Sequence, residues 1–181
     1  QWRRELIAGV NPNLGHEALA EMEAKLRSQG ATFTLITQNV DGLHQQAGSE
    51  NIIELHGDIT RTKCSQCDAI VERWEQPETH PPHCPHCDGP LRPDVVWFGE
   101  NLPPGALDTA LKAARESDVF FSNGTSALVQ PAASLQILAL EADALVVEIN
   151  PDRTPISDLA QIRFEEASGA ILPKLVEAAW G

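Results

Sequence analysis

Four cysteines constrain the fold of this chain more than any other feature, because all of them lie in one short segment. They form two Cys-x2-Cys pairs, Cys64 with Cys67 and Cys84 with Cys87, separated by 16 residues. This spacing predicts that the chain folds back on itself so that four thiolates bind one zinc ion tetrahedrally. Four thiolates leave no open coordination position, so we expect a structural zinc that stabilises a small lobe.

Two disulfides are the alternative interpretation of the same cysteines. Their clustering in an otherwise cysteine-free chain favours a metal site in a reducing compartment. His80, His83 and His86 lie near the second pair and could compete as ligands, although four thiolates already fill the coordination shell. Residues 74–82, between the pairs, are rich in Pro and Glu and predict an exposed loop.

Length and charge narrow the class of protein. The 181 residues fit one domain, or one domain with a small insertion. The net charge of -13 argues against direct nucleic-acid binding and allows basic peptides as partners, or it serves solubility alone. We find neither a membrane-spanning apolar run nor a signal peptide, and expect a cytoplasmic protein. The chain starts at Gln1 inside a helical pattern, so we expect further residues upstream.

Two apolar runs end in polar side chains. The first, 33–37, has the length of a buried strand, and the second, 52–55, ends on a His-Gly pair. In open α/β sheets, ligands bind in the crevice beyond the carboxyl ends of the strands. The polar residues that follow these two strands are therefore candidates for a binding site: Gln38, Asn39, Asp41 and His56.

Each candidate also has a structural interpretation. Asn39 and Asp41 can hold a small polar ligand such as an amide, or they can form a turn that caps a helix starting near 42–44. His56 precedes a glycine that allows close approach, which suits a general base, but a lone histidine is more often structural.

Strand and helix patterns alternate after the cysteines, which predicts an α/β fold with a parallel sheet. We expect strands at 119–122, 144–149 and 162–164, and helices at 105–115, after Pro131 and at 171–180. Gly124, Thr125 and Ser126 follow the first of these strands and suit a phosphate or ribose, although ordinary turns use the same residues. Residues 94–100 predict a short strand, either core with a turn or an edge that pairs with an extended peptide.

Taken together, six motifs resemble those of the sirtuins (Sir2 family), NAD-dependent protein lysine deacylases, in the family's order and over nearly the whole chain. They are Thr37–His44, Glu54–Gly57, the two cysteine pairs, Val95–Glu100, Gly124–Ser126 with Val129 and Pro131–Ala133, and Glu148–Asn150. The resemblance implies a Rossmann-like parallel sheet with helices on both faces, formed by 1–58 and 94–181. It also implies an inserted zinc-ribbon lobe at 59–93.

The same resemblance implies a reaction and its residues. The acyl oxygen of a modified lysine attacks the ribose carbon that carries nicotinamide, and His56 deprotonates a ribose hydroxyl, giving free lysine, nicotinamide and O-acyl-ADP-ribose. NAD is then a co-substrate and one zinc ion is structural. The positions that match the family's NAD-binding residues are Gln38, Asn39, Asp41, Gly124, Thr125, Ser126, Asn150 and Ser168. Acyl-lysine peptides bind by strand pairing along Val96, Phe98, Gly99 and Glu100. Nucleic acid and membrane are not expected partners.

The sequence also departs from the family pattern. A glycine-rich loop of the Gly-Ala-Gly-x-Ser type is absent, so we expect these 181 residues alone to bind NAD poorly and to be nearly inactive. A Tyr-x-x-Arg pair marks relatives that remove succinyl groups. Ungapped counting places Gln1 at the Arg position, and a one-residue gap would place Arg3 or a neighbour there. We favour deacetylation with desuccinylation as a second activity. The alternatives are an impaired NAD- or peptide-binding module, and an NAD glycohydrolase or ADP-ribosyltransferase on the same fold.

Overall fold

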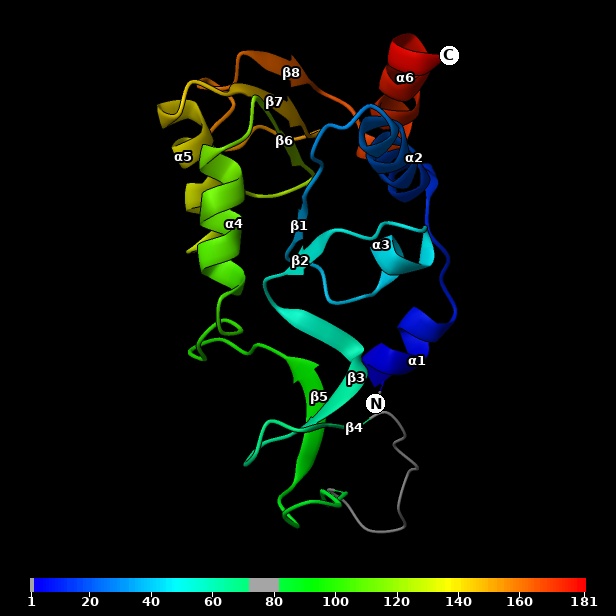
Figure 1. Cartoon of the computed structure of the whole chain (residues 1–181), viewed down its shortest axis with the longest axis vertical. Coiled ribbons are helices and arrows are strands. Elements are labelled where there is room, and N and C mark those ends of the chain that lie inside the picture. The colour runs from blue at the N-terminus through cyan, green and yellow to red at the C-terminus, as the bar shows by residue number, and fades with distance from the viewer. Residues whose placement is uncertain (1, 72–81) are drawn as a thin grey trace. The chain divides into compact units, whose positions relative to one another are not determined.

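The computed structural model describes residues 2–71 and 82–181 (Figure 1). Gln1, His80 and the greater part of the predicted 74–82 loop lie outside the described residues. The chain divides into two compact units. The cysteine unit consists of 1–10, 37–42 and 54–103, and the sheet unit consists of 11–36, 43–53 and 104–181. The division that the sequence predicts, at 59 and 93, stays a prediction.

A parallel sheet forms the centre of the sheet unit. Its strands are β6 (Val119–Asn123), β7 (Leu145–Ile149) and β8 (Ile162–Phe164), in the order β6-β7-β8. Both pairs of neighbouring strands are parallel, as the alternation of strands and helices predicts. A smaller two-stranded sheet pairs β1 (Leu35–Thr37) with β2 (Ile52–Glu54).

Helices pack on both faces of the parallel sheet because successive side chains of β7 point to opposite sides. Val147 and Ile149 join a core formed with α2 (Leu14–Ser28) and α6 (Ser168–Trp180). Val146 joins a second core with Ala139 of α5 (Leu135–Glu141). The remaining helical elements of this unit are α3 (Leu43–Gln46), α4 (Ala106–Arg115), which packs against α5, and the 3-10 turn η1 (Ala132–Ser134). The predicted α/β fold with helices on both faces is thereby confirmed.

The last helix starts earlier than the sequence predicts. We expected it at 171, but α6 begins at Ser168 and contains Pro173. A proline inside a helix removes one backbone hydrogen bond. Ile171 and Leu172 of this helix are buried in the core, at 6% and 0% exposure, and this burial outweighs the lost bond.

An antiparallel ribbon forms the centre of the cysteine unit. Its middle strand, β3 (Gly57–Cys64), pairs with β4 (Ile70–Val71) on one side and with β5 (Leu91–Val95) on the other. The strand expected at 94–100 therefore ends at Val95, and the residues after it form a turn. Helix α1 (Trp2–Ala8) contributes Arg4, whose guanidinium donates to the carbonyls of Ile59 and Arg61. No described helix has the length and apolar character to cross a membrane.

Candidate active site and metal centre

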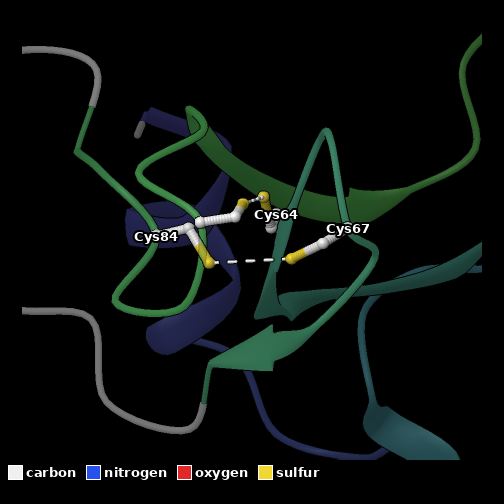
Figure 2. A group of neighbouring side chains, drawn as sticks. Cys64, Cys67 and Cys84 are labelled. Carbon is white, nitrogen blue, oxygen red and sulfur yellow. Dashed lines mark hydrogen bonds between the residues drawn. The ribbon is translucent and has the colours of Figure 1, made fainter.

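The four cysteine sulfurs converge at the end of the ribbon (Figure 2). All four lie within 4.8 Å of one another, with 3.4 Å between the Sγ atoms of Cys64 and Cys87 and 3.8 Å between those of Cys67 and Cys84. Sulfurs at about 2.3 Å from a tetrahedral zinc lie about 3.8 Å apart, whereas a disulfide requires about 2.05 Å. The cluster therefore fits one zinc ion, and all four cysteines are free thiols rather than disulfides.

The two knuckles are built alike, with one buried and one exposed cysteine each. In each knuckle, a backbone N–H two residues further on donates to the sulfur of the first cysteine, from Gln66 to Cys64 and from His86 to Cys84. Backbone N–H groups of Cys67 and Gln66 lower the pKa of Cys64 to about 6, which favours the thiolate that zinc requires. Among the described residues, no histidine belongs to this cluster.

His56 is held in a defined orientation inside the cysteine unit. Its Nδ1 lies 3.0 Å from the carbonyl oxygen of Gln38, and its own carbonyl accepts from the N–H of Val96 at 3.0 Å. Because a carbonyl only accepts, Nδ1 carries the proton of the neutral ring, and Nε2 is left as a proton acceptor. The imidazole is half-buried, so one side of it reaches solvent.

The loop of residues 37–42 lies against the segment that carries His56. Leu55 donates to the carbonyl of Thr37 at 3.0 Å, and Ile59 donates to that of Val40 at 2.9 Å. Asn39 is exposed and Asp41 is half-buried. The structure thus brings together Gln38 and His56 directly, and it carries Asn39 and Asp41 on the same loop.

The predicted peptide-binding segment follows β5. Val96 is half-buried, whereas the side chain of Phe98 is fully exposed at 102%. The carboxylate of Glu100 accepts hydrogen bonds from Arg92, which with the N–H of Trp97 lower the pKa of Glu100 to about 2.

The predicted nucleotide-binding residues of the sheet unit lie after β6 and β7. Gly124 has a φ of +59°, and its N–H donates to the carbonyl of Ile149 at 2.9 Å. Asn150 is buried at 7% exposure, and its side-chain amide donates to the carbonyl of Thr125 at 2.8 Å. The structure therefore joins Asn150 to the 124–126 loop, with Ser126 exposed in it. Ser168 is the first residue of α6, and within residues 2–71 and 82–181 no hydrogen bond joins it to this loop.

Sequence reasoning missed a buried carboxylate in the same unit. Glu148 of β7 is 1% exposed and accepts from the hydroxyls of Thr154 and Ser157 and, at 3.1 Å, from Nε of Arg163. These bonds fix the chain that follows Asn150. An acidic residue inside the apolar run 145–149 was the signal, because a buried charge needs partners.

The Sir2 family model matches residues 1–131. An NAD-dependent protein deacylase of Aquifex aeolicus is 48% identical over 180 residues, which is 97% of this chain and 72% of the relative. An NAD-dependent protein deacylase of Thermus thermophilus is 47% identical, over 94% of this chain and 66% of the relative.

Solved structures give the same result. A Sir2 homologue in complex with NAD superimposes with a TM-score of 0.88 at 42% identity, covering 98% of this chain and 68% of that one. A Sir2 protein bound to acetylated peptide gives a TM-score of 0.84 at 31% identity, over 96% of this chain and 73% of that one. The fold, the zinc-binding cysteine cluster and these similarities lead to one conclusion: the chain belongs to the Sir2 family of NAD-dependent protein deacylases.

Proposed function

We propose that the gene product that carries these residues removes acetyl groups from protein lysines with NAD as co-substrate, with succinyl groups as a second class of substrate. The observation that carries the proposal is the hydrogen bond between Nδ1 of His56 and the carbonyl of Gln38, at 3.0 Å. It leaves Nε2 as an acceptor, which is the state that a general base needs before the reaction. His56 accepts the proton of a ribose hydroxyl at this atom, and that hydroxyl then takes up the acyl group.

In the cysteine unit, the proposed NAD-binding residues are Gln38, Asn39 and Asp41. Asn39 and Asp41 hold the nicotinamide amide, since their side chains offer a donor and an acceptor, and Gln38 contacts the adjoining ribose. In the sheet unit, the binding residues are Gly124, Thr125, Ser126, Asn150 and Ser168. Support comes from the solved relative in complex with NAD, and the co-substrate supplies the ribose electrophile that the acyl oxygen attacks.

The partners are acyl-lysine peptides that pair with the backbone after β5. Val96, Phe98, Gly99 and Glu100 form this peptide-binding segment. A net charge of -13 favours basic peptides, and we propose no direct contact with nucleic acid or with a membrane. Four free thiols suit a reducing compartment, so we place the protein in the cytoplasm.

The test is an assay of the gene product that carries these residues, with an acetyl-lysine peptide and NAD. We expect free lysine peptide, nicotinamide and O-acetyl-ADP-ribose in equal amounts by mass spectrometry. H56N should lower kcat/KM by about a hundredfold or more, as loss of a general base does. H86N, which replaces an exposed histidine, is the matched control and should keep normal activity.

Two outcomes would contradict the proposal. Full activity of H56N would show that His56 is not the general base. Nicotinamide release that does not require acyl-lysine would indicate a glycohydrolase or ADP-ribosyltransferase. Calorimetry on the 181 residues alone tests the missing glycine-rich loop. We expect NAD to bind more weakly than micromolar, because no such loop offers backbone N–H groups to the pyrophosphate.

A further inference from the structure

A tight turn of residues 97–100 follows β5 in the cysteine unit. The N–H of Glu100 donates to the carbonyl of Trp97 at 3.0 Å, and Gly99, at the third position, has a φ of +87°. These are features of a type II turn, which requires glycine at that position. The turn carries the fully exposed Phe98 at its second position.

Arg92 of β5 also stabilises this turn, through the side chain of Glu100. Its Nη1 and Nη2 donate to the two carboxylate oxygens of Glu100 at 2.5 and 2.7 Å, and one of these oxygens also accepts from the N–H of Trp97 at 3.1 Å. The guanidinium also lies 5.9 Å from the centre of the Trp97 ring. A bidentate arginine–carboxylate pair fixes orientation as well as distance, so both ends of the turn are tied to β5.

The arrangement carries a cost. Nε of Arg92 is buried and has no hydrogen-bond partner in 2–71 and 82–181. A buried donor without a partner is unfavourable and is uncommon in native proteins. The guanidinium of Arg92 is therefore oriented so that both Nη atoms bind Glu100, while its Nε is left without a hydrogen bond.

The turn also adjoins the segment that carries the base. The residue before it, Val96, donates its N–H to the carbonyl of His56 at 3.0 Å. This bond at one end and the bonds of Glu100 at the other hold the backbone of residues 96–100 in a single conformation.

We propose that Arg92 is a positioning residue, which acts through Glu100 to hold residues 97–100 in the conformation that accepts an acyl-lysine peptide. This inference rests on the proposed deacylase function. Glu100 then serves peptide binding by shaping the turn, since both of its carboxylate oxygens are already occupied within it.

Loss of the pair should act on peptide binding alone. If the free turn occupies the binding conformation about a tenth of the time, the apparent affinity for peptide falls about tenfold. R92M should therefore raise the KM for peptide about tenfold and leave kcat and the KM for NAD within about twofold. R92K should fall between R92M and the unsubstituted protein, because an ammonium cannot form the two parallel bonds of the guanidinium fork.

A double-mutant cycle with R92M and E100Q tests whether the two residues act as one. Residues that act as a unit give non-additive effects, so the double variant should also show about a tenfold higher peptide KM. R27M is the control, because it removes another arginine–carboxylate pair, Arg27 with the exposed Glu50, in the sheet unit. It should leave all three kinetic constants unchanged.

The outcomes separate this inference from the function on which it rests. A normal peptide KM in R92M, or a hundredfold increase in the double variant, would overturn the positioning role while deacylation itself persists. Absence of deacylation by the unsubstituted protein would instead contradict the proposed function.

Discussion

Gly57 joins His56, the proposed base, to the ribbon, and replacing Gly57 by alanine is the sharpest test of how closely β3 and β5 pack beside it. Its φ is +77°, and a Cβ built at this position would lie 2.2 Å from the backbone carbonyl oxygen of Asp94. Ordinary contact begins at 3.4 Å, and the obstructing atom is backbone, which cannot rotate away. In G57A the strands β3 and β5 must therefore move apart by about 1 Å near His56.

The expected loss of stability has three parts. A left-handed conformation costs an alanine about 1–2 kcal/mol. Separation of the strands would stretch the bond from the N–H of Val96 to the carbonyl of His56, now 3.0 Å, and its loss costs about 1 kcal/mol. Residual crowding adds to this, so we expect G57A to lower the free energy of unfolding by about 3 kcal/mol or more.

Urea unfolding of the zinc-loaded protein, followed by tryptophan fluorescence, measures this loss. G99A is the matched control, because Gly99 has a similar φ of +87° in the same unit and nothing within 4 Å of its missing Cβ. The control should lose only the conformational part, about 1–2 kcal/mol. Equal losses in G57A and G99A would refute the steric argument, and with it the close approach of β3 and β5 beside His56.

Three further predictions concern the buried pair, the turn and the metal. R163M should lower the free energy of unfolding by about 3 kcal/mol, because it leaves the buried Glu148 without its cation, whereas R153M, which removes an exposed pair, should stay within about 0.5 kcal/mol in the same urea titration. In NMR titrations, R92M should raise the pKa of Glu100 from about 2 towards 4.5. A Glu100 pKa that R92M leaves unchanged would contradict the pairing. Because the pKa of Glu100 is depressed in the folded state, the stabilisation by the pair is complete above about pH 4.5 and is lost only as the pH falls through about 2. Removal of zinc by a chelator should unfold the cysteine unit as seen by amide exchange, with recovery on adding zinc, and unaltered exchange would contradict a structural metal.

The sequence predicted those parts of the fold that depend on local pattern. The cysteine spacing predicted the convergence of four sulfurs, because two short knuckles fix where their ligands point. The alternation of strands and helices predicted the parallel pairing of β6 with β7, because the crossover between them, which contains α5, brings the two strands into the same direction.

Features that depend on distant partners could not be predicted in this way. The strand expected at 94–100 ends at Val95, because after one last backbone bond, from Val96 to His56, the chain turns at 97–100 instead of continuing along β3. The last helix was expected from 171, but α6 begins at Ser168, and Leu172 is buried in the core that α6 shares with α2. The roles of Arg92 and Glu148 depend on side chains that only the tertiary fold brings within reach.

For the candidate site, the sequence indicated the residues but not their geometry. His56 and Gln38 were both candidates, yet nothing in their spacing predicted that the carbonyl of Gln38 would accept from the imidazole. Assignment of the ring's proton, on which its use as a base depends, required the hydrogen bond itself.

The way in which the two compact units share the chain limits how the protein can be divided. The polypeptide passes from one unit to the other five times, after residues 10, 36, 42, 53 and 103. No single cut in the gene therefore yields either unit as a continuous piece. A fragment that ends at 103 includes every segment of the cysteine unit, but it also exposes the apolar face of α2, which packs on α6 in the whole chain. A fragment intended to isolate the zinc-binding half would thus need solubilising substitutions on α2, or a short linker in place of residues 11–36.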